Sequence, residues 1–329
     1  MFFLGVDGGG TKTKFVLINK KLEVCSIIET TTAHIFQVGK QGIVKILKKG
    51  VNEIINEANI KKEDIKYVVL GMPGYTELKN NDIEIEQAVK EIFNFTKYYI
   101  CNDAEIGWAG SLACQPGISI VAGTGSIGFA IDSERNKFRT GGWGNFIGDE
   151  GSAHWISKKA LEIYSKQKDS RLPPSILLDI IEKEYNVKQE YEMINIIHNK
   201  YKLDRRQIAK LSVIVFKAAK EGCPYSRDIF NEAAYELYLH VEALIKKTNF
   251  KEPILLSYAG GVFKSGELII KPFKELINGL KMPINLIEPK MEPSFGAAFY
   301  AYLLHECNTA TAYIVDKMVK NIKKTILED

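Results

Sequence analysis

Two glycine-rich stretches hold the residues of this sequence that are best suited to bind phosphate. The first, GVDGGGTKTKF, runs from Gly5 to Phe15 and places Asp7 before three glycines and Thr11 and Lys12 after them. Bare backbone presents amide N–H groups and lets another group come close, and phosphate is the usual ligand of such a loop. An ordinary hairpin turn is the alternative, because a single motif match carries a high false-positive risk.

The same construction returns in ISIVAGTGSIGFAID, from Ile118 to Asp132, where a Gly-Thr-Gly-Ser turn again separates two apolar segments. Gly123–Gly128 fits the spacing G-x-G-x-x-G, but a dinucleotide fingerprint must open a helix and extended chain follows here. A Walker A loop is also excluded, because Thr11 stands where its lysine should be. The recurrence favours two phosphate-binding hairpins of another kind.

The elements that would position these hairpins also come in pairs. Apolar and β-branched segments at 1–6, 14–18 and 22–29 predict three strands around the first hairpin. A second pair, YVVLGMPG at 67–74 and ILLSYAGG at 254–261, reads as two buried strands that end in small residues before a helix. This repetition predicts an α/β fold made of two similar halves, with a ligand cleft between them.

Length and composition limit the number of domains and the classes of partner that the protein can have. A chain of 329 residues exceeds one usual compact core, so two domains are expected. The net charge of +4 is small for this length and demands neither a nucleic-acid nor a membrane partner. No apolar run reaches the roughly 20 residues of a membrane span, and the start lacks the basic region of a signal peptide, so we expect a cytoplasmic protein.

The cysteines are widely scattered, which argues against both a metal cluster and a disulfide framework. They are Cys25, Cys101, Cys114, Cys223 and Cys307.

Six motifs in one order give the sequence a resemblance to a known family. They are GVDGGGTKTKF, LGMPG, CNDAEIGWAG, IVAGTGSIG, GGWGNFIGDEGSAHWI and LSYAGGVF. The sequence resembles the N-acetylglucosamine kinase branch of the BadF/BadG/BcrA/BcrD ATPase family, within the sugar-kinase, actin and Hsp70 superfamily. The resemblance covers nearly the whole chain and implies two duplicated actin-like (ribonuclease H-like) α/β domains with an interdomain cleft.

The resemblance and the element pattern together suggest domain boundaries. The first domain is expected at 1–115 and the second at 116–307, with a helical insertion at about 151–248. The final helix, 308–329, is expected to return to the first domain.

The resemblance implies that ATP and Mg²⁺ are the cofactors. Asp7 would hold the water shell of the metal, which keeps several waters and needs few protein ligands. The alternative is a turn aspartate that bonds nearby amides. The implied nucleotide contacts are Gly9, Gly10, Thr11, Lys12, Thr124, Gly125, Ser126, Ala259, Gly260 and Gly261.

Asp103, in the stretch CNDAE, has two interpretations. By position it caps the helix that follows, since aspartate is a favoured N-cap. By resemblance it is the general base that takes the proton from the attacking sugar hydroxyl. A weak carboxylate base suffices there, because phosphoryl transfer depends mostly on positioning and charge stabilisation.

The sugar contacts implied by the resemblance come from two further stretches. GGWGNFIGDEGS supplies Gly142 and Asp149, although an acid there can also serve a helix dipole, and Ser152 is expected to cap the next helix. The segment at 30–39, TTTAHIFQVG, is expected to be a polar loop that supplies His34 and Phe36.

The implied activity is phosphorylation of the 6-hydroxyl of an N-acetylated amino sugar, N-acetylglucosamine and also N-acetylmuramic acid, by a homodimeric enzyme. A glucosamine kinase is one alternative. An ATPase activator of a radical dehydratase or aryl-CoA reductase is another, and the scattered cysteines argue against it, because such activators bridge an iron–sulfur cluster between subunits.

Overall fold

The structure of the protein is a computed structural model that describes residues 1–251, 253–306 and 309–328. Cys307 lies outside the described residues, as do positions 252, 308 and 329. The chain folds into two compact units. Unit 1 comprises 1–116 with 288–329, and unit 2 comprises 117–287.

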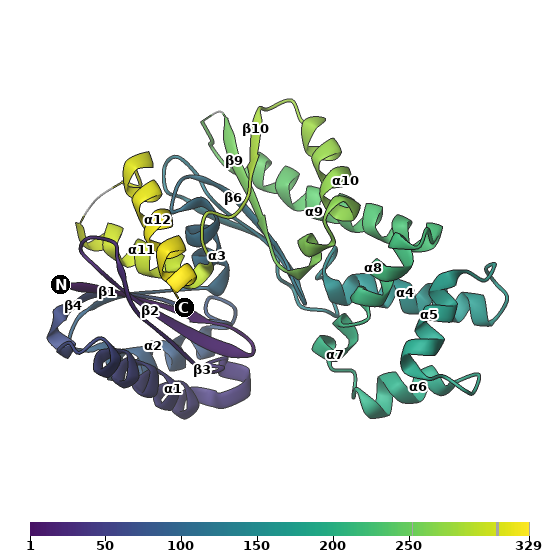
Figure 1. The fold of residues 1–329 in the computed structure, drawn as a ribbon, viewed down its shortest axis with the longest axis horizontal. Helices are drawn as coiled ribbons and strands as arrows, with labels where there is room; N and C mark the ends of the chain where they lie inside the picture. The colour runs from purple at the N-terminus through teal and green to yellow at the C-terminus, as the bar shows by residue number, and fades with distance from the viewer. Residues whose placement is uncertain (252, 307–308, 329) are drawn as a thin grey trace. The chain divides into compact units, whose positions relative to one another are not determined.

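Unit 1 contains a five-stranded sheet in the order β3-β2-β1-β4-β5 (Figure 1). Its strands are β1 (Phe2–Gly8), β2 (Lys12–Asn19), β3 (Val24–Thr31), β4 (Ile65–Gly71) and β5 (Lys97–Cys101). The first three strands run antiparallel, whereas β4 and β5 run parallel to β1. The first glycine-rich stretch is therefore the β1–β2 turn, as the sequence predicts.

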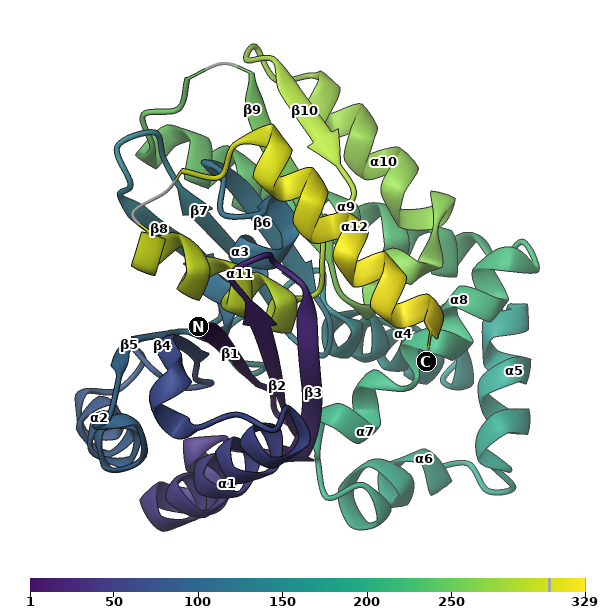
Figure 2. The same ribbon diagram turned by 60° about the vertical axis from the view of Figure 1, so that its left-hand side comes forward.

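Helices cover both faces of this sheet. They are α1 (Ile35–Glu57), α2 (Lys79–Phe93), α3 (Asp103–Leu112), α11 (Pro293–Glu306) and α12 (Ala312–Glu328), with a short 3₁₀ turn, η1, at Lys62–Asp64. Figures 1 and 2 show α1 and α2 on one face and α11 and α12 on the other. Apolar residues two apart on β1, Leu4 and Val6, face the α1 and α2 layer, and residues of α1 at helical spacing, such as Ile43 and Leu47, complete that core.

The domain boundary differs from the predicted one, because α11 belongs to unit 1. The sequence predicts a return to the first domain at 308, yet unit 1 resumes at residue 288. The reason is close packing between small residues. A Cβ built at Gly296 of α11 would lie 2.2 Å from the amide nitrogen of Gly110 in α3, and one at Gly5 of β1 would lie 2.2 Å from the amide nitrogen of Ala298. Glycine at these positions lets the backbones touch.

Unit 2 repeats the plan of unit 1. Its strands are β6 (Gly117–Ala122), β7 (Ser126–Ile131), β8 (Lys137–Gly141), β9 (Ile254–Ala259) and β10 (Ile284–Ile287). They form a sheet in the order β10-β9-β6-β7-β8. Strands β6, β7 and β8 run antiparallel, and β9 and β10 run parallel to β6. The predicted duplication of an α/β fold is confirmed.

Most helices of unit 2 fill the interval in which a helical insertion is predicted. They are α4 (Ala153–Lys168), α5 (Ile176–Tyr185), α6 (Glu192–Asn195), α7 (Arg205–Ala209), α8 (Ser212–Lys220) and α9 (Pro224–Lys247), with a π-helical turn, η2, at Ile196–Lys200. A 3₁₀ turn, η3 (Gly261–Ser265), and a further helix, α10 (Glu267–Asn278), follow β9 and lie outside that interval. α9 and α10 pack against each other and on the sheet, and α4 joins α5, α7 and α8 in a helical block. Among the described residues, no helix is both long and apolar enough to span a bilayer.

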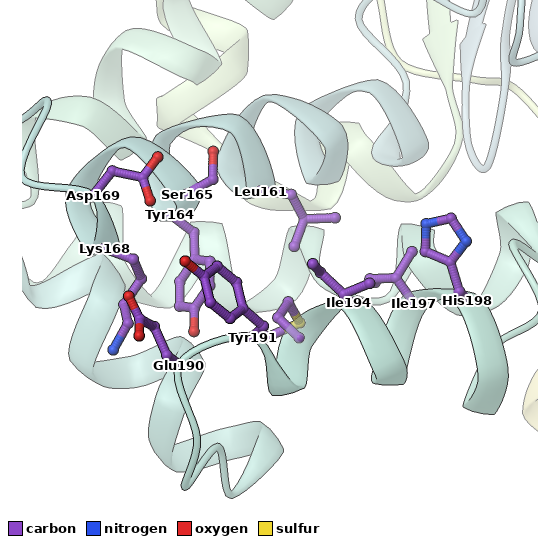
Figure 3. Close-up of a pocket in the computed structure, with 11 residues that line it drawn as sticks. Leu161, Tyr164, Ser165, Lys168, Asp169, Glu190, Tyr191, Ile194, Ile197 and His198 are labelled. Carbon is purple, nitrogen blue, oxygen red and sulfur yellow. The ribbon is translucent and has the colours of Figure 1, made fainter.

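A cavity of about 380 Å³ opens between α4 and the η2 turn in this helical block (Figure 3). Its lining is largely apolar and includes Leu161, Ile194 and Ile197. Tyr164 also lines it, and the hydroxyl of this tyrosine is buried without a hydrogen-bond partner in the described part of the chain. None of the residues predicted to bind sugar, nucleotide or metal lies in its lining.

Candidate active site

The first glycine hairpin encloses a cavity of about 320 Å³ within unit 1. Five residues that the sequence predicts to act together line it: Asp7, Gly9, Gly10, Thr11 and Lys12. The lining is completed by Lys14 and Glu292, which are not among the predicted site residues. The predicted phosphate loop therefore borders a cavity, and the carboxylate of Glu292, which is distant in sequence, lines the same cavity.

The chain that follows β3 holds the hairpin in place. The Gly9 amide donates to the Lys12 carbonyl at 2.9 Å and closes the turn. The hydroxyl of Thr32 donates to the Gly9 carbonyl at 2.7 Å, and the side-chain amide of Gln37 donates to the Gly10 carbonyl at 3.0 Å. A Cβ at Gly10 would meet nothing within 4 Å, so the tip of the turn borders open space.

The two lysines of β2 lie in the same cavity, but both are paired. Lys12 donates to Glu29 at 2.6 Å, and both side chains are exposed. Lys14 donates to Glu292 at 2.8 Å, with its side chain only 18% exposed. Residues two apart on a strand share a face, and this periodicity is the signal that could have found Lys14 beside Lys12.

Asp7 stands at the end of β1 in a setting that disfavours its charge. Burial raises its pKa to about 7, and the carboxylates of Asp103 and Glu292 raise it as well, whereas Lys14 and Lys12 act in the opposite direction. A hard cation would relieve this repulsion, and carboxylate oxygens are ligands that Mg²⁺ accepts. No cluster of three or more metal-ligating side chains occurs in the described ranges, so a metal here would rely on Asp7, water and phosphate.

Asp103 is exposed at the first position of α3, and the capping interpretation of this residue is wrong. The N-cap is Asn102, whose side-chain oxygen accepts the Ala104 amide at 2.9 Å. The Asp103 carboxylate accepts from the same amide at 3.1 Å. The helix start is thus satisfied by its neighbour, and Asp103 combines a fixed direction with access to solvent.

The segment predicted as a polar loop, 30–39, is a loop only at 32–34: its first two residues end β3, and its second half, 35–39, is helical. α1 begins at Ile35, and Gly39, with φ +62°, kinks it after the first turn. His34 and Phe36 lie on this first turn with ring centroids 5.6 Å apart, and the Phe36 side chain is exposed. The prediction is wrong for 35–39 because Gly39 marks a kink within α1 and not the end of a loop.

The loop after β4 links these aromatic residues to the start of α3. A Cβ at Gly74 would lie 3.7 Å from the Phe36 ring and 3.9 Å from the His34 ring. The next residue, Tyr75, accepts a hydrogen bond from the Asn102 side chain at 2.9 Å through its carbonyl. The tertiary structure thereby gathers His34, Phe36 and the Asp103 helix start around one loop of unit 1.

The second glycine hairpin borders a cavity of about 610 Å³ within unit 2. Two predicted nucleotide contacts from distant stretches, Thr124 and Gly261, line it together. Its apolar walls include Phe216 and Phe230. The charged side chains in its lining are Arg206, Lys210 and Lys264. This combination of apolar walls and cations suits a flat organic ring that carries an anionic tail.

Ser126 supports the second hairpin from behind. Its hydroxyl donates to the Glu150 carbonyl at 2.6 Å, and its amide donates to the Asp149 carboxylate at 3.3 Å. The residue is 3% exposed. Both of its donors, which the resemblance directs at phosphate, are engaged internally in this structure.

Asp149 packs against the same hairpin. Its side chain is 4% exposed, and a Cβ at Gly125 would lie 2.7 Å from a carboxylate oxygen, so a larger residue there would displace the Asp149 side chain. Burial raises the pKa of Asp149, and the Ser126 amide and Arg205 act against this shift. Ser152 caps α4 as predicted, accepting the Trp155 amide at 3.2 Å.

The remaining predicted contacts differ in their surroundings. The Gly142 amide donates to the Ser126 carbonyl at 3.0 Å, which ties the glycine-rich loop after β8 to the hairpin. Gly260, next to Ala259 at the end of β9, has φ +102°, and a Cβ there would lie 2.3 Å from the Ala122 carbonyl oxygen. Packing therefore requires glycine at 260, whereas a Cβ at Gly261 would meet nothing within 4 Å.

The fold defines a class of protein: duplicated α/β proteins in which each half has a five-stranded sheet with a glycine-rich turn between two of its antiparallel strands. The model of the BadF/BadG/BcrA/BcrD ATPase family matches residues 4–301. The chain belongs to this family, which confirms the resemblance seen in its motifs.

Relatives with a named activity extend over most of the chain. It is 29% identical to an N-acetylmuramic acid/N-acetylglucosamine kinase of Clostridium acetobutylicum, over 91% of this chain and 98% of the relative. It is 26% identical to an N-acetyl-D-glucosamine kinase of Dictyostelium discoideum, over 91% and 97%. A solved structure from Chromobacterium violaceum, provisionally named an N-acetylglucosamine kinase, superposes with TM-score 0.73 and 21% identity, over 92% of this chain and 98% of that one. This superposition supports the actin-like class of the fold.

Proposed function

We propose that the protein is an ATP-dependent kinase that transfers the γ-phosphoryl group to the 6-hydroxyl of an N-acetylated amino sugar. The observation that carries the proposal is in unit 1. There an exposed and oriented carboxylate, Asp103, acts electrostatically on Asp7, which lines the hairpin cavity. An acceptor hydroxyl needs such a base beside a place for phosphate.

Asp103 serves as the general base in this proposal. As the sugar oxygen forms its bond to the γ-phosphorus, Asp103 takes the hydroxyl proton and the bond from that phosphorus to the β-bridging oxygen breaks. The electron pair of the broken bond leaves with ADP. The Ala104 amide, 3.1 Å from the carboxylate, keeps the base in one orientation through the step.

ATP use follows from the family, and we assign the nucleotide to the cavity of unit 2 that Thr124 and Gly261 line. Phe216 and other apolar side chains accommodate the base, and Arg206 and Lys210 offset phosphate charge. Mg²⁺, held by Asp7 and water, neutralises charge on the phosphates when it is bound.

We assign the sugar to side chains from two stretches of the chain. His34 and Phe36 provide a ring edge and an apolar surface near the Asp103 helix start. Asp149, with Gly142 on the neighbouring loop, accepts hydrogen bonds from sugar hydroxyls. We propose an N-acetylated sugar because the two relatives reported above are named as kinases of such sugars. Glucosamine is the alternative, because the chain is also 20% identical to a glucosamine kinase of Vibrio cholerae.

The alternative of an activator ATPase has less support. Three of the described cysteines, Cys101, Cys114 and Cys223, are buried, and Cys25 is exposed. A cluster shared between subunits needs thiolates that both subunits can reach. Homodimer formation and a cytoplasmic location stay predictions, and light scattering of the purified protein tests the first.

A coupled ADP-release assay tests the proposed function. The panel contains N-acetylglucosamine, N-acetylmuramic acid, glucosamine, N-acetylmannosamine and glucose, each with MgATP. We expect turnover with the N-acetylated sugars and phosphate on the 6-oxygen of the product, as read by NMR. ADP release that no sugar stimulates, together with bound iron in the purified protein, would favour the activator instead.

A further inference from the structure

Arg205 lies beside the carboxylate that we assign to the sugar. Its guanidinium nitrogen Nη1 is 3.4 Å from the Asp149 carboxylate. Within the part of the chain that the structure describes, Asp149 is the side chain's one hydrogen-bond partner. Asp149 is buried, whereas the Arg205 side chain is 45% exposed. A guanidinium has five N–H donors in a planar fork, so donors remain for a ligand that reaches Asp149.

The next residue, Arg206, has a different environment. Arg206 lines the nucleotide cavity of unit 2 and pairs with Asp204, whereas Arg205 does not line that cavity. Consecutive helical residues project about 100° apart, so two adjacent arginines at the start of α7 serve different neighbours. One is directed at the nucleotide cavity and the other at Asp149.

We propose that Arg205 is a specificity-determining residue that recognises a carboxylate on the substrate. The substrate class is an amino sugar whose ring carries an anionic ether substituent, such as the lactyl group of N-acetylmuramic acid. This inference rests on the proposed function and goes beyond it by naming the residue that selects the charged sugar. Arg205 makes a charge-assisted hydrogen bond to the substituent while Asp149 accepts from a ring hydroxyl.

The charge balance around Asp149 supports this assignment. Asp149 is one acidic group, and the carboxylate of an incoming lactyl group would be a second. Burial and the nearby Glu150 raise the pKa of Asp149, whereas Arg205 and the buried His154 favour its charged form. Burial lowers the pKa of His154, so the guanidinium is the cation at this place near neutral pH. A bidentate guanidinium–carboxylate pair is among the stronger polar contacts in proteins.

The test compares N-acetylmuramic acid, its methyl ester and N-acetylglucosamine at saturating MgATP. It uses the wild-type protein, Arg205→Gln, Arg205→Lys and the matched control Arg206→Gln. We expect Arg205→Gln to lower kcat/KM for N-acetylmuramic acid by about tenfold or more, and for N-acetylglucosamine by about threefold or less. Arg205→Lys keeps part of the preference for N-acetylmuramic acid. Turnover of the neutral ester changes with neither Arg205 variant. When the ATP concentration is varied, Arg206→Gln raises the KM for ATP with either N-acetylmuramic acid or N-acetylglucosamine.

Each other outcome overturns the inference. An equal loss on all three sugars would mean that Arg205 acts through Asp149 or on ATP. Turnover of N-acetylglucosamine without any turnover of N-acetylmuramic acid by the wild type would remove the proposed substrate and leave the kinase proposal standing. Lack of turnover with every sugar would remove the proposed function as well. Arg205→Lys guards against a folding defect in the glutamine variant, since it retains the ion pair with Asp149.

Discussion

The charge of Asp103 raises the pKa of Asp7, although the two residues belong to different elements of unit 1. Asp7 is the last residue but one of β1, and Asp103 is the first residue of α3. Burial is the larger cause of the shift and the Asp103 carboxylate is the next. The two acids with separate assignments, metal and base, are therefore coupled electrostatically.

Asp7 makes the stability of the metal-free protein depend on pH. Its pKa is about 7 in the native state, against 3.8 for an ordinary aspartate, so between these values the native state holds a proton that the unfolded chain releases. The free energy of unfolding therefore falls as pH rises through this window. We therefore compare the free energy of unfolding of Asp7→Asn with that of the wild type at two pH values. From pH 4 to pH 8 this difference should change in favour of the variant by on the order of 1–3 kcal/mol.

Urea unfolding in the presence of EDTA at pH 4, 6 and 8 measures this difference. Groups remote from Asp7 titrate alike in both proteins, so the comparison reports on Asp7 and on the acids coupled to it, Asp103 and Glu292. A stability difference that stays constant across this range would mean that Asp7 is already ionised in the native state.

Asp103→Asn is expected to lower kcat by about 10²–10⁴-fold and to leave ATP binding unchanged, because a general base acts on the acceptor and not on the nucleotide. ADP release with N-acetylglucosamine and calorimetric titration with ATP measure the two properties. Glu84→Gln, at an exposed position of α2, is the control. Retained turnover in Asp103→Asn would place the base elsewhere.

Gly125→Ala should destabilise unit 2, because the new Cβ would lie 2.7 Å from the Asp149 carboxylate. A cost of about 1–3 kcal/mol is typical of such overpacking. The matched control is Gly123→Ala on the same turn, where a Cβ meets nothing within 4 Å. Thermal unfolding gives the melting temperatures of the two variants. Equal values would show that the Asp149 side chain moves away from the hairpin at little cost in stability.

Val213→Glu places a carboxylate in the wall of the nucleotide cavity at a position that is 67% exposed. An acid suits the first turn of α8, so folding should be unaffected, while repulsion of phosphate should raise the KM for ATP by about tenfold. The control is Ile194→Glu, 58% exposed in the cavity of Figure 3, which should leave that KM unchanged. If Ile194→Glu raised the KM for ATP and Val213→Glu did not, the nucleotide would have to be assigned to the cavity of Figure 3 instead.

Local patterns are sufficient to predict the strands around both glycine hairpins and the buried strands β4 and β9, but not β8 or β10. Alternating apolar residues and glycine turns fix β1 and β2 around the first hairpin, and the repeat at Ile118–Asp132 predicts β6 and β7. These features depend on neighbours in sequence, which is why they can be recognised without a structure. The start of α1 escapes such a prediction because the kink at Gly39 interrupts the helical pattern.

The repetition, the hairpins and the family can be recognised from the residues alone, because each depends on short stretches with their own backbone chemistry. Which charges meet depends on the folded chain. Lys14 pairs with Glu292, 278 positions away, and Asp149 meets Arg205, 56 positions away, through the packing of whole elements. Such contacts depend on how sheets and helices stack, and no local spacing encodes that arrangement.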